Sequence, residues 1–352
     1  MTDLSLTADR FSFSLGLNEP LSTSHGEVGS RKGFLVAVSD GKRTGYGEAT
    51  PLRPWTEPYG ECEVALREYL ERLEDEGTVP ADETDAPAAR YAVSVAVADL
   101  RAKRRGVPLY AHLGGGGLEE AKVGVNATVG DAGIEETLAE AERCVKGGYG
   151  TVKLKVGARG VEEDIERVLG VDEAFGVCVR ADANGSWGYD EASRFADAVA
   201  GLGSFEYLEQ PLDPGNLEAH ARLRHSSGID VALDEGLLCH SIKEVVEENA
   251  ADHAVLKPMS TGGIREARRI CVEAQESGVV PVVSNLIESV VGRTAAAHVA
   301  ASVPVETACG LGTGGLLREE MGDGVVRNGE ISISEKPGNA ETEVGMDTDR
   351  GK

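Results

Sequence analysis

Five charged residues recur along the second half of the chain, each at the end of a short apolar run. Successive members are 23 to 27 residues apart, which is the length of a strand, a loop, a helix and a return loop. This spacing predicts that five side chains lie at equivalent ends of successive parallel strands, namely those of Lys155, Asp182, Glu209, Asp234 and Lys257. In a barrel of alternating strands and helices, these strand ends converge on one mouth.

The apolar runs themselves support a barrel. Near-continuous apolar segments are what parallel strands need when helices cover one face and a packed core covers the other. From residue 121 onward, such segments alternate with seven helical stretches, so we expect an α/β fold, a TIM-like (β/α)7β barrel over residues 121–314. Its eight strands are expected within residues 123–129, 151–156, 177–184, 205–211, 230–236, 253–259, 279–285 and 306–312.

The first 120 residues do not follow this rhythm. Residues 34–49 predict a β-hairpin, and residues 62–77 and 88–106 carry apolar residues at helical spacing. An antiparallel sheet followed by helices predicts an N-terminal α+β capping domain over residues 1–120. Residues 315–352 are expected to complete this domain with one or two returning strands.

Three of the five strand-end residues are carboxylates, Asp182, Glu209 and Asp234. Gathered at one mouth they repel each other unless a cation lies between them, and oxygen-only ligands favour a hard ion such as Mg²⁺ or Mn²⁺. A single Asp at a strand end is usually a helix cap, but three in register favour a metal site. Glu235 should point to the opposite side of its strand end and support the site.

Lysines flank the expected metal site. Lys153 and Lys155 are two residues apart on one strand and therefore share a face, whereas Lys257 lies on the sixth strand, across the barrel. Crowded cations lower the pKa of a lysine, which would allow one of them to act as a base near neutral pH. After the sixth strand, the backbone N–H groups of Gly262 and Gly263 either hold a carboxylate or phosphate or form a tight turn.

The composition of the chain limits the kinds of partner that it is expected to bind and the cell compartment in which it is expected. Sixty acidic against 35 basic residues give a net charge of −25, which disfavours nucleic acid and anionic membranes. No basic stretch followed by an apolar core opens the chain, so we expect a cytoplasmic protein without a secretory signal. Single cysteines without a CxxC pair predict free thiols, and the sequence gives no indication of oligomeric state.

The acidic excess has two explanations, a high-salt cytoplasm or an ordinary acidic bacterial enzyme. A protein adapted to high salt is expected to unfold on transfer to low salt, because mutual repulsion of its carboxylates is then less screened. Circular dichroism at falling salt concentration measures this. Retention of the folded signal in dilute buffer would favour the ordinary acidic enzyme.

The order of these motifs resembles the enolase superfamily, in its muconate-lactonizing subgroup. The chain carries KLK on the second strand, RADAN, LEQP and LDE on the next three, and LKPMSTGG on the sixth. Within the subgroup it is most similar to the o-succinylbenzoate synthase family, through GYGEATPLRPWT in the cap and SNLIESVVG and GLGT near the last strands. Residues 24–36 would then form a mobile loop of the cap.

The resemblance implies a Mg²⁺-dependent dehydration of 2-succinyl-6-hydroxy-2,4-cyclohexadiene-1-carboxylate to o-succinylbenzoate, a step of menaquinone biosynthesis. It implies that the three strand-end carboxylates bind the metal and that Lys155 moves a proton from the carbon α to the substrate carboxylate to the departing hydroxyl. Lys257 would stabilise the anion from the other face. Positive charge or support would come from Lys153, Arg180, Asn184, Glu235, Gly262, Gly263, Ser284, Asn285 and Glu288.

Departures from the family pattern leave other reactions open. Arg53, Pro54 and Trp55 replace the usual Pro-Gly-Phe, and Gly312 stands where Asp is common. Dipeptide epimerases carry DxD at the eighth strand, which is missing here and counts against them. An N-acylamino acid racemase or a muconate cycloisomerase would use the same lysines, because two bases flanking one carbon suit proton transfer on both faces. A noncatalytic barrel that binds a metal or small ligand is disfavoured by the intact lysines.

Overall fold

A three-stranded antiparallel sheet opens the chain in the computed structural model, which describes residues 6–23, 26–79, 85–116, 122–304, 307–319, 321 and 326–339. Its strands are β1 (Thr7–Thr23), β2 (Gly26–Ser39) and β3 (Thr44–Ala49), in that order. The hairpin predicted from residues 34–49 is therefore confirmed as β2–β3. Residues 26–36, expected in a mobile loop, lie instead in β2 and pair with β1; residues 24 and 25 fall outside the described part.

The sequence analysis missed β1, although the signal for a strand was present. Phe11, Phe13, Leu15 and Leu17 alternate with small or polar residues, which is the period-2 pattern of a strand, and Leu15 and Leu17 are buried. Helices α1 (Tyr59–Glu76), α2 (Pro87–Arg105) and α3 (Leu109–Leu113) follow the sheet. Helix α2 packs so closely on β3 that a Cβ at Gly47 would lie 2.0 Å from the carbonyl oxygen of Ala92.

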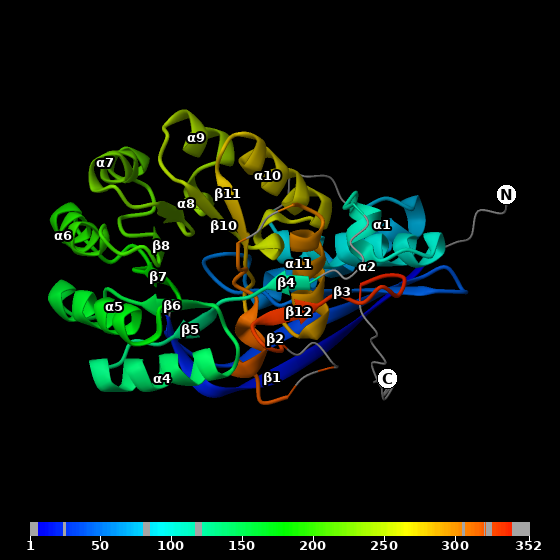
Figure 1. The fold of residues 1–352 in the computed structure, drawn as a ribbon. Helices are drawn as coiled ribbons and strands as arrows, with labels where there is room; N and C mark the ends of the chain where they lie inside the picture. Colours follow the sequence, from blue (N-terminus) through cyan, green and yellow to red (C-terminus); the bar gives the residue numbers. More distant parts are fainter. Residues whose placement is uncertain are drawn as a thin grey trace.

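Seven parallel strands in chain order form the second sheet, as the apolar runs predicted. They are β5 (Ala127–Val129), β6 (Thr151–Lys155), β7 (Cys178–Asp182), β8 (Phe205–Glu209), β9 (Val231–Leu233), β10 (His253–Leu256) and β11 (Val280–Val283). Helices surround them on the outside (Figure 1). These helices are α4 (Ile134–Lys146), α5 (Val161–Phe175), α6 (Tyr189–Val199), α7 (Leu217–Ser227), α8 (Gly236–Cys239), α9 (Ile242–Glu247), α10 (Ile264–Glu276) and α11 (Val290–Ala301).

The expected eighth strand is reduced to two bridged residues in the described part of the segment. Cys309 pairs in parallel with Val125, just before β5, and Gly310 pairs in parallel with Ser284, just after β11. These two bridges join the first and last strands of the sheet. Glycine weakens a strand, and a Cβ at Gly310 would lie 2.6 Å from the Ser284 Oγ, so close contact replaces an extended ladder here.

The C-terminal segment returns along the molecule, but not as an added strand of the N-terminal sheet. Strand β12 (Glu330–Ser332) pairs antiparallel with β4 (Lys122–Gly124), which leads into the barrel. Strand-like pairing with the N-terminal part is limited, among the described residues, to single bridges from Leu317 to Leu17 and from Gly338 to Pro108. The segment also contacts that part through side chains, since the N–H of Asn339 donates to Asp99 Oδ1 at 2.8 Å. The expected returning strand therefore exists with a different partner.

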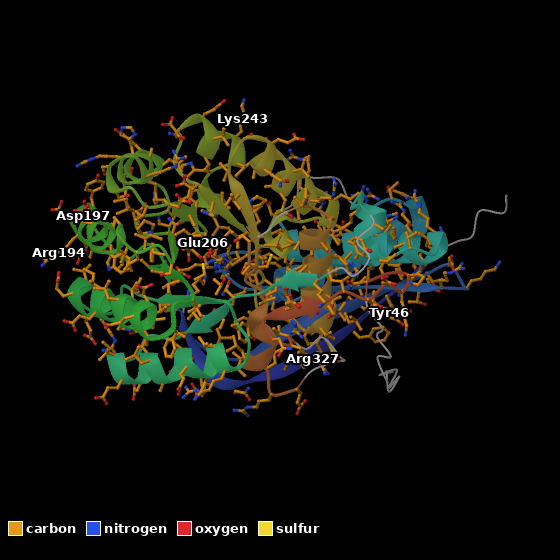
Figure 2. The ribbon with its side chains drawn as sticks, in the orientation of Figure 1. Tyr46, Arg194, Asp197, Glu206, Lys243 and Arg327 are labelled. Atoms are coloured by element: carbon orange, nitrogen blue, oxygen red, sulfur yellow. The ribbon has the colours of Figure 1, made fainter. Side chains whose placement is uncertain are left out.

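The outer face of the barrel is strongly charged. Side chains such as those of Arg194, Asp197 and Lys243 project outward from α6 and α9 (Figure 2). Charge on the solvent side of the helices agrees with the amphipathic pattern of their sequences. Among the described residues, no helix is long and apolar enough to cross a membrane.

Candidate active site

Lysines and carboxylates meet where the barrel strands end. Val152 and Leu154 of β6 are fully buried on one face, so Lys153 and Lys155 point to the other, as strand alternation predicts. Lys153 Nζ donates to Asp182 Oδ2 at 2.9 Å and to Glu209 Oε1 at 2.8 Å. Lys155 Nζ lies 2.6 Å from the same oxygen of Asp182. The charged groups of three neighbouring strands therefore contact each other directly.

The ion pairs shift the pKa values of Lys153 and Asp182 in opposite directions, and both shifts favour the charged forms. Burial would lower the pKa of Lys153, but the attraction of Asp182 and Glu209 outweighs it and holds that pKa well above its usual value. Burial would raise the pKa of Asp182, yet Lys153 and Lys155 together hold that pKa well below its ordinary range. Lys153 is therefore a fixed cation. Lys155 has a side chain that is 36% exposed, against 13% for Lys153, and is the lysine that a substrate can reach.

The other two carboxylates carry less compensating charge. Burial, reinforced by repulsion from Asp182, raises the pKa of Glu209 to about 7 against the opposing effect of Lys153. Burial likewise raises the pKa of Asp234 to about 6, although the Lys257 ammonium group forms an ion pair with it. An additional cation beside these oxygens would favour their charged forms.

The donor chemistry of the three carboxylates fits a hard divalent cation. Glu209 Oε2 is buried and has no hydrogen-bond partner among the described residues, so one oxygen of the set has nothing to compensate it. In the same part of the chain no three carboxylate, imidazole or thiol groups converge tightly enough to hold an ion as they lie. The ammonium groups of Lys153 and Lys257 rest on the carboxylate oxygens, and a bound cation would take their place there.

Asn184 connects the lysine side of the site with Glu235. Its φ of 45° lies in the left-handed region, which Asn adopts more readily than most residues. Its Oδ1 accepts from Lys155 Nζ at 2.8 Å, its Nδ2 donates to Glu235 Oε1 at 2.9 Å, and its backbone N–H donates to Asp182 Oδ1 at 3.1 Å. These bonds orient Lys155 and link Glu235 to the site through Asn184.

Gln210, which the sequence analysis did not single out, fastens the ends of β8 and β9 together. It is fully buried with a φ of 39°, and its Oε1 accepts from the backbone N–H groups of Asp234 at 3.0 Å and Gly236 at 2.8 Å. Its Nε2 donates to the carbonyl of Leu212 at 3.0 Å. Its place in the LEQP motif, directly after Glu209, was the available signal.

We expect Gln210→Ala to lower the free energy of unfolding by about 2–4 kcal/mol, because it leaves two buried N–H groups without an acceptor. Urea denaturation measures the change. Gln210→Glu keeps the accepting oxygen but loses the donor to Leu212 and buries a charge, so we expect it to be destabilised as well. A loss below about 0.5 kcal/mol for Gln210→Ala would show that water replaces the amide.

Arg180 has different surroundings from those expected for a residue that adds positive charge beside the substrate. Five hydrogen bonds occupy its guanidinium, two to Glu206 at 2.7 and 3.1 Å, and one each to Asn126 Oδ1, Thr307 Oγ1 and the carbonyl of Ala308. The side chain is fully buried. Arg180 therefore ties β7 and β8 to the segment that closes the barrel and offers no spare donor to a ligand.

The turn at Gly262 and Gly263 is covered by the N-terminal part of the chain. The Gly262 carbonyl accepts from Arg90 Nη1 at 2.8 Å, and the N–H of Ile264 donates to Ser94 Oγ at 3.2 Å. Gly262 has a φ of 72°, which an L side chain rarely adopts. Of the two explanations given for this turn, the geometry supports the tight turn, packed beneath α2.

Ser284 and Asn285 lie where the barrel closes. Ser284 Oγ donates to the carbonyl of Gly310 at 3.1 Å, and Asn285 Oδ1 accepts from Thr313 Oγ1 at 3.0 Å. Asn285 Nδ2 is buried with no hydrogen-bond partner among the described residues. Ser284 thus holds the closing segment, and Asn285 retains a donor for a bound molecule.

Glu288 belongs to the contact between the N-terminal part and α11. Burial and repulsion from Glu48 raise the pKa of Glu288 to about 8. Glu48, on β3, accepts from the N–H groups of Ser289 at 2.9 Å and Gly292 at 2.8 Å at the start of α11. A carboxylate there also complements the helix dipole. Sequence analysis missed Glu48, which is visible only as part of the GYGEA segment.

Trp55 brings the N-terminal part directly onto the site. Its ring centroid lies 3.4 Å from Lys257 Nζ, a cation–π contact, and Lys257 also pairs with Asp234. Arg53 behaves differently, because its side chain is 61% exposed and its guanidinium lies 4.0 Å from Glu61. Within the segment that replaces Pro-Gly-Phe, Trp55 is therefore in contact with a site lysine, whereas Arg53 faces solvent.

Two family models match the chain. One, described as Enolase C-terminal domain-like, matches residues 136–342, and the other, MenC, N-terminal domain, matches residues 6–100. The chain is 30% identical to an L-Ala-D/L-Glu epimerase of Clostridium acetobutylicum, over 92% of this chain and 95% of the relative. It is 39% identical to an o-succinylbenzoate synthase of Mycobacterium bovis over 57% of this chain and 61% of the relative. The chain is 30% identical to an N-succinyl-L-Arg/Lys racemase of Bacillus cereus, over 72% of this chain and 68% of the relative.

Solved structures show the same arrangement. A substrate-liganded L-Ala-D/L-Glu epimerase from Bacillus subtilis has a TM-score of 0.85 and 28% identity, covering 95% of this chain and 97% of that one. A dipeptide epimerase from Methylococcus capsulatus, complexed with Mg and the dipeptide L-Arg-D-Lys, has a TM-score of 0.82 and 26% identity, covering 96% and 99%. The similar proteins thus include a synthase, a racemase and epimerases.

Proposed function

The chain belongs to the enolase superfamily, as an enzyme of its muconate-lactonizing subgroup, and from this premise we propose that it is an o-succinylbenzoate synthase. The observation that carries the proposal is the match of residues 6–100 to the MenC N-terminal domain. This part of the chain brings Trp55 onto Lys257, so it is placed to select the substrate. The 39% identity to an o-succinylbenzoate synthase supports the same choice.

We assign residues 1–120 as the capping domain, completed by residues 315–352, and residues 121–314 as the catalytic barrel. Asp182, Glu209 and Asp234 would hold Mg²⁺, and Mn²⁺ would suit the same oxygen donors. The unpartnered oxygen of Glu209 and the Mg in the structure of a dipeptide epimerase relative support this assignment. When bound, the ion supplies stabilisation of negative charge on the substrate carboxylate.

Lys155 would carry the proton. As a neutral amine it would take the hydrogen α to the substrate carboxylate, and the electrons of the broken C–H bond would delocalise onto that carboxylate. As an ammonium it would then give the same proton to the departing hydroxyl, so that the electrons form the new ring double bond, the C–O bond breaks and water leaves. Asn184 Oδ1 holds the amine in place. Lys257, charged and packed on Trp55, would stabilise the anion from the opposite side.

A second candidate is racemisation of an N-acylamino acid. Lys155 ends β6 and Lys257 follows β10, with β7, β8 and β9 between them in the sheet, so the two amines approach the mouth from different sides. Such a pair suits removal of a proton from one face and its return to the other. The similarity to an N-succinyl-L-Arg/Lys racemase favours this reaction as the alternative.

Dipeptide epimerisation is less well supported by the residues at the barrel closure. The dipeptide-epimerase pattern carries DxD at the eighth strand, and this motif is missing here. Gly312, which stands where Asp is common in the synthase pattern, does not separate the two reactions: a Cβ there would lie 2.9 Å from the carbonyl oxygen of Asn126, so no Asp fits without a backbone shift. The 30% identity to an epimerase therefore indicates shared ancestry more than a shared substrate.

The experiment that tests the proposal compares two substrates in one preparation. Purified enzyme with Mg²⁺ is assayed for dehydration of the cyclohexadiene carboxylate and for racemisation of an N-succinylamino acid. We expect dehydration with the higher kcat/KM. Racemisation alone would overturn the proposal in favour of the second candidate, and neither activity would support a noncatalytic role.

The contact between Trp55 and Lys257 predicts where specificity lies. Trp55→Ala is expected to change KM or substrate preference by roughly tenfold, because a shielded cation–π contact contributes about 1–2 kcal/mol. Steady-state kinetics on both substrates measures this. Trp55→Phe retains the ring and Arg53→Ala removes only an exposed side chain, so both should stay close to the wild type. An equal fall in kcat for every substrate would place Trp55 in the chemical step.

A further inference from the structure

A group of arginines lies between α2 and α10, away from the proposed catalytic residues. Arg101 and Arg105 lie in the C-terminal half of α2, with Arg105 as its last residue. Arg265 and Arg268 are on α10. The chain as a whole has a net charge of −25, so such a concentration of positive charge needs a reason. We call these four residues the arginine cluster.

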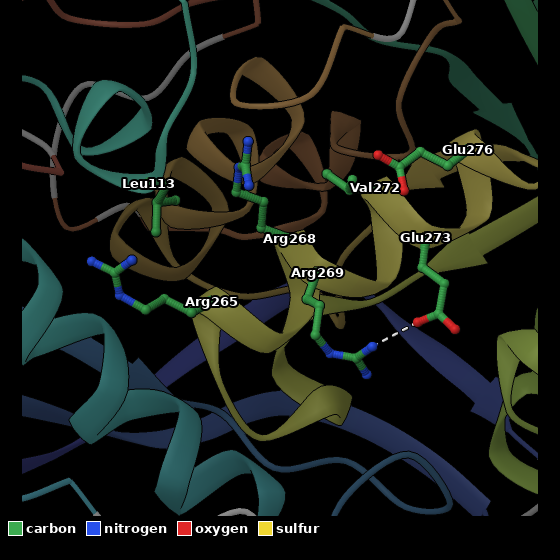
Figure 3. Close-up of a pocket in the computed structure, with 7 residues that line it drawn as sticks. All are labelled: Leu113, Arg265, Arg268, Arg269, Val272, Glu273 and Glu276. Carbon is green, nitrogen blue, oxygen red and sulfur yellow. Dashed lines mark hydrogen bonds and ion pairs between the residues drawn. The ribbon is translucent and has the colours of Figure 1, made fainter.

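Within the part of the chain that the structure describes, the arginine cluster has no carboxylate partner. In the described ranges, none of its four members forms an ion pair, and Arg268 Nε is buried without a hydrogen-bond partner. The adjacent Arg269 is different, because Glu266 at 2.7 Å and Glu273 at 2.6 Å neutralise it. Figure 3 shows Arg269 turned toward Glu273, while Arg265 and Arg268 extend on the side of Leu113.

The contacts of His112 indicate that the guanidinium groups of the arginine cluster have more hydrogen-bond donors than the described residues have acceptors for them. Its Nδ1 lies 3.3 Å from Arg105 Nη1, and its Nε2 lies 2.9 Å from Arg265 Nη2. Burial and then repulsion from Arg265 and Arg105 lower the pKa of His112 to about 4, so the ring is neutral at pH 7. A neutral imidazole accepts at only one nitrogen. One of the two guanidinium groups therefore faces an N–H and still needs an acceptor.

Repulsion between the arginines of the cluster also favours a bound anion. Burial, together with Arg101, Arg105 and Arg268, lowers the pKa of Arg265. Two guanidinium groups that repel each other from neighbouring helices gain stability when an anion lies between them. Planar guanidinium groups bind the oxygens of phosphates and carboxylates in pairs, which a lysine does not do.

Two cavities adjoin the cluster. One of about 460 Å³ is lined by Arg90 and Arg101 from α2 and by Arg265 from α10, with apolar walls from Val97 and Ile264. It also contains Glu266, whose charge Arg269 neutralises. The other, of about 360 Å³, is lined by Arg265, Arg268 and Arg269 and also by the carboxylates of Glu273 and Glu276, so the larger cavity is the better place for an anion. Arg265 lines both, so the two cavities adjoin along α10. The larger one admits a small molecule and has a charged and an apolar side.

We propose that the arginine cluster binds a small multivalent oxyanion, carrying phosphate or carboxylate groups, between α2 and α10. The ligand would bridge the N-terminal part and the barrel, just beyond the turn that follows Lys257. Convergence of guanidinium groups from two helices on a cavity fits a small ligand better than a flat protein surface. The site does not depend on the reaction proposed above.

Isothermal titration of the full chain with inorganic phosphate and, separately, with citrate tests the site at constant ionic strength. We expect saturable binding of at least one of the two anions, with chloride giving none. The double substitution Arg101→Ala and Arg265→Ala should weaken binding by at least about tenfold, because two charge-assisted hydrogen-bonding groups are lost. Both side chains are exposed, so the variant should fold, and circular dichroism checks this.

Matched variants separate this site from other sources of binding. Arg194→Ala removes an exposed arginine on the far helix α6 and should leave the affinity unchanged. Lys155→Ala should also bind the anion normally, which separates the cluster from the barrel mouth. The proposal is overturned if neither anion binds saturably, or if the double variant binds as well as the wild type. It is equally overturned if the double substitution changes only the oligomeric state, because the cluster would then be a subunit contact.

Discussion

Lys155→Arg is expected to abolish dehydration, whereas Lys257→Arg should retain measurable turnover. In the proposed reaction Lys155 both removes and returns the proton, and a guanidinium group does not deprotonate in this pH range. A positioned general acid–base group contributes about 10²–10⁴-fold to the rate, so a loss of about 10³-fold or more follows. Lys257, paired with Asp234 and packed on Trp55, needs only to remain positive.

Single-turnover kinetics of both variants measures the difference, with circular dichroism and metal titration as controls for folding and metal binding. Solvent-deuterium exchange at the α-carbon of an unreactive substrate analogue gives an independent readout, which Lys155→Arg should lose. A racemase needs proton transfer from both lysines. Equal loss of turnover in the two variants, with fold and metal binding intact, would therefore favour the racemase over the one-base dehydratase.

Asp234→Asn is expected to remove metal affinity and activity together. The substitution takes one negative charge from the oxygen set and leaves the Lys257 ammonium group without its ion-pair partner. Since both effects weaken the site, we expect a loss of metal affinity beyond the about 10–100-fold that an outer-shell substitution produces. Activity should disappear in excess EDTA and return with Mg²⁺ or Mn²⁺.

Glu235→Gln is the matched control for this prediction. Glu235 is adjacent in sequence but contacts Asn184 at 2.9 Å, so its loss should affect metal affinity by no more than the outer-shell range. Calorimetric titration with Mg²⁺ and thermal unfolding of both variants separate metal binding from folding. Full activity of the wild-type enzyme in excess EDTA would contradict the metal assignment.

Much of the barrel followed from local patterns. A parallel strand buried on both faces has to be apolar, and its apolar run ends where the chain leaves the sheet, so β6 to β10 and their terminal charges were predictable. The eighth strand was overestimated, because an apolar run does not say how many hydrogen bonds its backbone makes. Cys309 and Gly310 form single bridges instead. Strand β1 was missed although Phe11, Phe13, Leu15 and Leu17 alternate along it, so the local signal was present.

The partners of the charged residues could not be predicted from the sequence. Arg180 is the direct partner of Lys153 across β6 and β7, and yet its guanidinium forms hydrogen bonds with Glu206, Asn126 and the segment that closes the barrel. Gln210 and Glu48 accept backbone hydrogen bonds from other segments of the chain. The periodicity of apolar residues does not predict such bonds. Such contacts depend on the direction of each side chain within the packed molecule.

The sequence by itself determined the order of strands and helices, the family, and the charged residues at successive strand ends, because these depend on local apolar periodicity and motif spacing. Only the tertiary structure decided that Trp55 covers Lys257, that α2 closes the turn at Gly262, and that His112 meets Arg265, 153 residues away, at the arginine cluster. The physical reason is that these are contacts between remote segments, which exist only once the N-terminal part has packed against the barrel.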